Sequence, residues 1–142
     1  MKLTNILVPL AGTVIDPDII EYAIALARST KAKITVVHVI EVKWNMPLDA
    51  VLDAELERGE EILAHAEKVA EKLGSHITTE VLQAREAAAA IIDTAVEQKS
   101  ELILLGMPYR KRLGRVYVGG TVEEVYLRAP CAVLAYRQEE PR

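Results

Sequence analysis

A chain of 142 residues, of which 51% are hydrophobic and 27% charged, has the size and composition of one globular domain covering residues 1–142. The formal net charge of -4 excludes a general nucleic-acid-binding protein, because such proteins need a basic face. A single cysteine, Cys131, excludes an internal disulfide and is typical of a reducing compartment. The apolar run at the N-terminus is too short for a signal peptide or a membrane span, so we expect a cytoplasmic protein without direct membrane insertion.

Short apolar runs along the chain predict five β-strands. These runs are residues 5–10, 33–40, 76–83, 101–106 and 131–136. Near-continuous hydrophobicity with many β-branched residues is typical of strands covered on both faces, and hence of a parallel sheet. The run at 76–83 alternates between two faces instead, so we expect this strand nearer an edge of the sheet.

Apolar residues at helical spacing occupy the gaps between these runs. The helical patterns cover residues 20–27, 48–73, 88–96 and 122–129. Asp16 is expected to cap the first helix, with Pro17 at its first position. Gly59 is expected to break the long second helix and Gly74 to end it, while Pro130 stops the fourth. Strands that alternate with helices predict a doubly wound α/β sheet.

Two loops at the carboxyl ends of strands have the composition of a ligand site. One is Pro9-Leu10-Ala11-Gly12-Thr13 after the first strand, and the other runs from 106 to 121 after the fourth. Ligands of open α/β sheets bind beyond the carboxyl ends of strands, where the strand order reverses. We therefore expect the ligand between these two loops.

The second loop has the features of an anion site. It leads into a helix that begins near Gly120 or Thr121, and a helix N-terminus favours phosphate. Gly119 and Gly120 would let the backbone approach an anion closely. The cations of this loop are Arg110, Lys111, Arg112 and Arg115. Two structural alternatives stay open: Thr121 and Glu124 fit a capping box, and the cations fit a solvated loop face.

Four stretches of the sequence are similar to one known family. From NILVPLAGT, through VVHVIE and ELILLG, to GGTVEEVYLRAPCAVLAYR, the chain resembles the universal stress protein family along nearly its whole length. The resemblance implies a Rossmann-like, adenine nucleotide alpha hydrolase-like fold: a five-stranded parallel sheet of strand order 3-2-1-4-5 with helices on both faces. Members commonly dimerise through the last strand, here 131–136. Some members bind ATP or AMP, and others bind no nucleotide.

The nucleotide motif of the family is only partly present. Members that bind carry Gly, two residues, Gly, nine residues, then Gly and Ser or Thr. Gly106 and Gly119 match, but Tyr109 replaces the second glycine and Gly120 stands where Ser or Thr is usual. Ala11 stands where binding members usually have Asp. The cofactor-binding residues that the resemblance implies are Pro9, Leu10, Ala11, Gly12, Thr13, Val39, Gly106, Arg110, Gly119, Gly120, Thr121 and Val122.

Several other residues are expected to have structural roles. His38 is predicted to be a satisfied core or interface residue, and no histidine or cysteine has metal-ligand spacing, so no metal is expected. Trp44 is expected to pack under the 41–47 loop or to line the mouth of the cleft, and Cys131 to be a buried inert thiol. Tyr109 would block the pocket, stack on a ring or cover the end of the sheet.

Two functions stay open. The first is a regulatory homodimer that binds ATP or AMP, with magnesium, at the loops after the first and fourth strands. The second is a dimer that binds no nucleotide and acts through an unidentified protein partner, such as a membrane transporter. We expect no enzyme and no catalytic residues, because the loops offer Thr13, Tyr109, Tyr117 and Thr121 with no Asp, Glu or His beside them.

Overall fold

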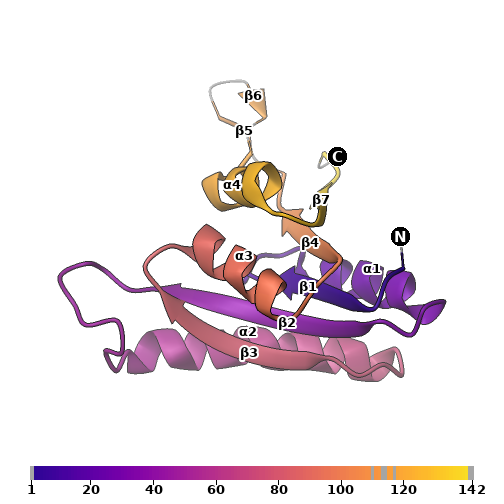
Figure 1. Ribbon diagram of the computed structural model, residues 1–142, viewed down its shortest axis with the longest axis horizontal. Coiled ribbons are helices and arrows are strands. Elements are labelled where there is room, and N and C mark those ends of the chain that lie inside the picture. Colours follow the sequence, from indigo (N-terminus) through magenta and orange to yellow (C-terminus); the bar gives the residue numbers. More distant parts are fainter. Residues whose placement is uncertain (1, 110, 113–114, 117, 141–142) are drawn as a thin grey trace.

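The computed structural model describes residues 2–109, 111–112, 115–116 and 118–140, and its main feature is a parallel sheet of five strands in the order β3-β2-β1-β4-β7 (Figure 1). The strands are β1 (Asn5–Pro9), β2 (Lys33–Glu41), β3 (Thr78–Ala84), β4 (Leu102–Met107) and β7 (Ala132–Arg137). Because β7 is the fifth strand of this sheet, the predicted order 3-2-1-4-5 is confirmed. The expected position of the 76–83 strand at an edge is also confirmed.

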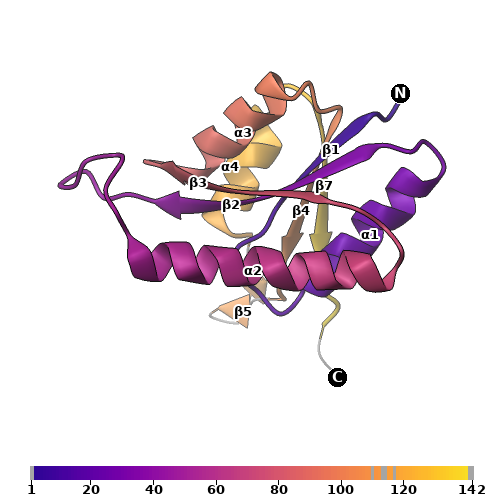
Figure 2. The same ribbon diagram turned by 90° about the horizontal axis from the view of Figure 1, so that it is seen from below.

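Two helices cover each face of the sheet (Figures 1 and 2). The helices are α1 (Asp16–Arg28), α2 (Asp53–Lys72), α3 (Ala87–Glu97) and α4 (Gly120–Arg128). Side chains of β1 alternate between the faces: Ile6 and Val8 pack against α1 and α2, while Leu7 packs against α3 and α4. All three are completely buried, which explains why the first strand has no polar face.

The strand order reverses next to β1. This strand pairs with β2 on one side and with β4 on the other, and both pairings are parallel. The carboxyl ends of β1, β2 and β4 therefore lie at the same end of the sheet, where an open α/β fold binds its ligands.

Two glycines, one expected to break the second helix and one expected to end it, have different roles. Gly74 follows the end of α2 with φ at +68°, a left-handed conformation that suits glycine, as predicted. The break expected at Gly59 is wrong, because α2 continues through it. A Cβ at Gly59 would lie 3.0 Å from the Cδ2 atom of His38, so this glycine lets the helix pack closely on β2. The start expected at Leu48 is also wrong, since α2 begins at Asp53.

The cap predicted at Asp16 is wrong, and the capping box left open for Thr121 and Glu124 does not form. In α1 the N-cap is Ile15, so Asp16 is the first helical residue, and its carboxylate accepts hydrogen bonds from Thr13 N and Oγ1 at 3.3 and 3.2 Å. In α4 the N-cap is Gly119, and no side chain in the described part of the chain caps the helix. Glu124 instead forms an ion pair with Arg128 at 3.2 Å.

The long loop after β4 contains additional structure. β5 (Lys111–Arg112) pairs antiparallel with β6 (Arg115–Val116), and the two lie beyond α4 in Figure 1. Arg110, predicted to contact phosphate, and Tyr117, one of the loop hydroxyls, lie outside the described residues. Within the described ranges, none of the helices is long and apolar enough to cross a membrane.

Candidate functional site

A cavity of about 320 Å³ lies at the carboxyl ends of β1, β2 and β4. Seven of the residues implied by the resemblance line it, and they come from three strands, one turn and one helix. These seven are Pro9, Leu10, Ala11, Val39, Gly106, Thr121 and Val122. We call this the switch-point cavity, because it lies beside the strand β1, where the strand order reverses.

The N-terminus of α4 forms one wall of the switch-point cavity. Its N-cap, Gly119, is extended at φ -65° and ψ 149°, and its carbonyl oxygen accepts the first helical hydrogen bond from Glu123 N at 3.0 Å. Within the described chain no side chain caps this end, so the amides of Thr121 and Val122, which line the cavity, keep their capacity to donate, whereas the predicted site residues Gly119 and Gly120 lie outside the lining. These amides and the helix dipole together form an environment that favours an anion.

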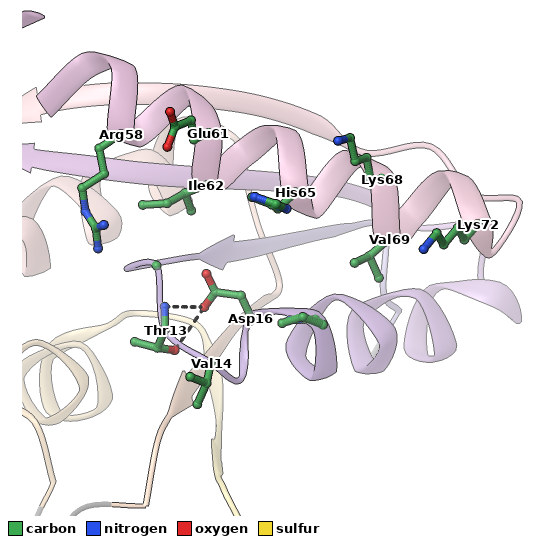
Figure 3. A pocket seen from close by; sticks show the side chains of 12 residues that line it. Thr13, Val14, Asp16, Arg58, Glu61, Ile62, His65, Lys68, Val69 and Lys72 are labelled. Atoms are coloured by element: carbon green, nitrogen blue, oxygen red, sulfur yellow. Dashed lines mark hydrogen bonds between the residues drawn. The ribbon is translucent and has the colours of Figure 1, made fainter. Parts of the chain in front are cut away.

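Gly12 and Thr13 face a different cavity. This second cavity, of about 500 Å³, lies between α2 and the turn after β1 (Figure 3). Gly12 has φ at +82°, which turns the chain away from the switch-point cavity. Figure 3 shows Thr13 bonded to Asp16 below the helix, with Arg58 at one end of the cavity and Lys72 at the other. The structure thus divides the predicted first loop between two cavities.

Electrostatics in the second cavity involve a half-buried carboxylate. Burial raises the pKa of the Asp16 carboxyl above its ordinary value, and the hydrogen bonds from Thr13 oppose this shift. Arg58, Lys68 and Lys72 of α2 line the same cavity, together with the carboxylate of Glu61.

Glu41, which sequence reasoning missed, and His38, which was predicted to be a satisfied structural residue, both line the switch-point cavity. Glu41, at the end of β2, accepts a hydrogen bond from Ala87 N at 2.9 Å through Oε2. His38 donates from Nδ1 to the Leu10 carbonyl oxygen at 2.8 Å. The expectation that no Asp, Glu or His lies beside the loops is therefore wrong. The signal for Glu41 was available, because it lies two residues after Val39 and thus on the same face of its strand.

The glycines of the partial motif differ in what surrounds them. A Cβ at Gly106 would collide with Ile19 of α1 and would lie 2.8 Å from Cδ1 of Ile15. Gly106 is therefore required by helix packing on the opposite face of the sheet from α4. A Cβ at Gly120 would meet nothing within 4 Å, so the space for the hydroxyl residue usual in the family remains.

Tyr109 covers the end of the sheet, one of the three roles considered for it. Its backbone N–H donates to Oε1 of Gln138 at 3.0 Å, and the guanidinium carbon of Arg137 lies 5.2 Å from its ring centroid. Tyr109 is half-buried and does not line the switch-point cavity. Its ring thus packs at the end of β7 and leaves the cavity open.

Other residues considered from the sequence lie away from the cavity. Trp44 is 78% exposed and does not line the switch-point cavity, so both positions expected for it are wrong. Cys131 is partly buried, and burial raises the pKa of its thiol, which lowers its nucleophilicity at neutral pH. Among the residues that the structure describes, no three His, Cys, Asp or Glu side chains are grouped to hold a metal ion.

Comparison with known proteins gives the family. The model of the universal stress protein family matches residues 2–137. A universal stress protein of Methanocaldococcus jannaschii is 30% identical over 140 residues, which cover 94% of this chain and 82% of that protein.

Solved structures agree with this assignment. The universal stress protein UspA from Lactobacillus plantarum has a TM-score of 0.79 and 28% identity, with 96% of this chain and 99% of that chain covered. The universal stress protein from Archaeoglobus fulgidus in complex with dAMP has a TM-score of 0.74 and 21% identity, with 95% and 98% covered. The chain belongs to the universal stress protein family.

Proposed function

We propose that this protein is a regulatory dimer that binds an adenine nucleotide in the switch-point cavity. The observation that carries the proposal is the lining of that cavity, which joins the ends of β1, β2 and β4 to the uncapped N-terminus of α4. A relative of the same fold binds dAMP, which supports an adenine ligand. The volume of about 320 Å³ suits the base and sugar of one nucleotide, at the lower end of the usual range for ligand sites.

The orientation of the ligand follows from the two ends of the cavity. Its most buried part is apolar, since Ile91 and Leu105 are each 3% exposed, and together with Val39 it suits the adenine ring. The phosphates then lie at the amides of Thr121 and Val122, where the dipole of α4 favours negative charge. Magnesium, when present, would accompany the phosphates of ATP at this outer end.

Glu41 replaces a missing carboxylate in this proposal. Ala11 removes the Asp that nucleotide-binding members of the family usually carry, but Glu41 brings a carboxylate into the same cavity from the next strand. One of its oxygens accepts from Ala87 N, and the other remains an acceptor for a ribose hydroxyl.

We propose binding without turnover. His38 already bonds to the Leu10 carbonyl oxygen, and Glu41, held by the first turn of α3, is assigned to the ribose rather than to the phosphates. A general base must instead reach the water or hydroxyl that it activates. We expect no more than trace ADP when the protein is incubated with ATP and magnesium; turnover at an ordinary enzymatic rate would contradict this part of the proposal.

The dimer is proposed to form through β7, which pairs only with β4 among the described strands. Apolar side chains beside this edge are exposed, including Leu127 of α4 at 72% and Leu134 of β7 at 46%. An open strand edge with apolar neighbours favours pairing with a second copy. We place this dimer in the cytoplasm, where the free thiol of Cys131 suits a reducing environment.

A second function, an interaction dimer without nucleotide, is favoured by the motif positions that depart from the family. Ala11, Tyr109 and Gly120 each lack the side chain usual in nucleotide-binding members, which would weaken both ends of the site. This protein would then act through a protein partner such as a membrane transporter.

Calorimetric titration of the dialysed protein with AMP, and with ATP and magnesium, separates the two functions. We expect a Kd below roughly 100 micromolar, about 5.5 kcal/mol of binding free energy. Ala11 is exposed at the cavity wall, so both of its test variants should fold. Ala11→Asp should tighten binding about tenfold, and Ala11→Trp should weaken it at least about tenfold, about 1.4 kcal/mol in each case.

The matched control is Val14→Trp, in the same turn. Val14 is 77% exposed and lines the second cavity, so its substitution should leave the affinity unchanged. If Val14→Trp abolished binding and Ala11→Trp did not, the nucleotide would bind in the second cavity instead. No heat and no thermal shift with either nucleotide would contradict nucleotide binding and leave the interaction dimer as the function.

A further inference from the structure

A groove along α3 and the edge strand β3 is not used by the proposed site. It has a volume of about 500 Å³ and lies beside the loop that joins β2 to α2. We call it the α3 groove. Its apolar lining residues include Trp44, Leu48, Leu82, Ala89 and Ala90, and its acidic ones are Glu86, Asp93 and Glu97.

The loop at residues 42–52 is fixed in place by two side chains of the 83–85 segment. Gln83 donates through Nε2 to the carbonyl oxygens of Leu48 and Ala50 at 2.9 and 3.1 Å. Arg85 donates through Nη1 to the Lys43 and Met46 carbonyl oxygens at 2.6 and 2.8 Å. Figures 1 and 2 show this loop projecting beyond the end of the sheet. These hydrogen bonds from Gln83 and Arg85 make the loop at residues 42–52 an ordered platform.

This platform exposes apolar side chains that the fold does not bury. Trp44 is 78% exposed, Val51 83% and Leu48 48%. The guanidinium of Arg85 lies 4.8 Å from the Trp44 ring centroid and holds one face of the ring, which leaves the rest open to solvent. An ordered apolar cluster in solvent marks an interaction surface.

The acidic side chains define the charge of the partner. Glu86, Asp93 and Glu97 lie along one side of α3 over about 16 Å, and none of them has a cation within salt-bridge distance in the described part of the chain. The one cation in the groove, Arg85, is occupied by backbone carbonyls and Trp44. The groove therefore attracts a positively charged partner.

The floor of the groove defines the shape of the partner. Ala89 and Ala90 are small and half-buried, so a partner helix can approach α3 closely in a groove that Trp44, Leu48 and the acidic side chains also line. We propose that the α3 groove docks a basic amphipathic helix of another protein, with its apolar face on Trp44, Leu48 and the alanines and its cations on the carboxylates.

Trp44 allows a direct test, because it is the only tryptophan of the chain. The probe is a synthetic helix of leucine and lysine at helical spacing, free of tryptophan and about 14 residues long, or about four turns. We expect its addition to shift the emission of Trp44 to shorter wavelength as the ring leaves water, with affinity that falls as salt is raised. The same helix with glutamate in place of lysine should produce no shift.

The variant that tests the charge requirement is the triple substitution Glu86→Gln, Asp93→Asn and Glu97→Gln. Glu86, Asp93 and Glu97 are exposed, so the variant should keep the fold, and the affinity for the lysine helix should fall at least about tenfold, about 1.4 kcal/mol. A matched control neutralises three exposed acids away from the groove, Glu21, Glu71 and Glu140, and should bind as the parent does.

Three results would overturn the proposal. The first is equal loss in the groove variant and in the control, which would mean non-specific attraction to an acidic protein. The second is binding without a change in Trp44 emission. The third is a shift of that emission with protein concentration alone, which would make a second copy of this chain the occupant. Because the test needs no nucleotide, its failure would leave the proposed function untouched.

Discussion

Gly106 is the motif glycine whose role the structure explains most fully, and its replacement by alanine tests that explanation. Gly106 lies in β4 outside the left-handed region, so alanine causes no backbone strain there. The added methyl group would collide with Ile19 and lie 2.8 Å from Cδ1 of Ile15, and both side chains are 1% exposed. Neither isoleucine can move into solvent, so the core must shift.

The cost follows from overpacking of a close-packed core. Inserting a methyl group of this kind costs about 1–3 kcal/mol. For a chain of this size each kcal/mol lowers Tm by about 3–4 °C, so Gly106→Ala should unfold about 3–12 °C below the parent. The assay is thermal unfolding followed by circular dichroism at neutral pH, with urea unfolding to obtain the free energy of unfolding.

The matched control is Gly120→Ala. A Cβ at Gly120 meets nothing within 4 Å, and alanine is the better helix former, so Tm should stay the same or rise. If Gly106→Ala were as stable as the parent, or if Gly120→Ala lost as much stability, the role assigned to Gly106 in packing would be refuted.

Two further predictions concern a charge and an interface. The hydrogen bond from Thr4 Oγ1, together with those from the Asn5 and Thr4 amides, lowers the pKa of Glu101 from 4.5 to about 2. The stabilising effect of the ionised Glu101 carboxylate is therefore complete above pH 4.5 and is lost as the pH falls towards 2. Glu101→Gln should therefore flatten the pH dependence of the free energy of unfolding between about pH 4.5 and 2; an unchanged slope in acid titration would contradict this. Leu134→Arg should place a charge on the exposed edge of β7 and convert the proposed dimer to a monomer, as measured by light scattering after gel filtration. The control Leu26→Arg, on α1, should remain dimeric. A dimer that survives Leu134→Arg would refute the interface.

The parallel sheet was predictable because its strands are hydrophobic on both faces. Ile6, Leu7 and Val8 are buried in succession, and this pattern distinguishes a central parallel strand from an edge strand such as β3. The start of α2 was not predictable in the same way, because Leu48 continues the apolar helical phase. It belongs instead to an exposed platform, and helical periodicity alone does not show whether a residue is covered.

The candidate site was predictable in position more than in detail. The ends of β1 and β4 meet because of strand order, so Pro9 and Gly106 come together as expected. The turn at Gly12 depends on one positive φ, which divides the first loop between two cavities in a way that side-chain identity does not show. Glu41 was missed because it ends β2 and lies in neither of the loops after β1 and β4, although the alternation of β2 places it on the same face as Val39.

The most direct test of the central claim is an amide NMR titration of the ¹⁵N-labelled protein with AMP. We predict the largest chemical-shift changes at the backbone amides of Val39, Thr121 and Val122 and smaller ones at the turn after β1, because these groups surround the switch-point cavity. Absence of shifts at millimolar AMP, or shifts confined to α2 residues such as His65 in the second cavity, would contradict the claim.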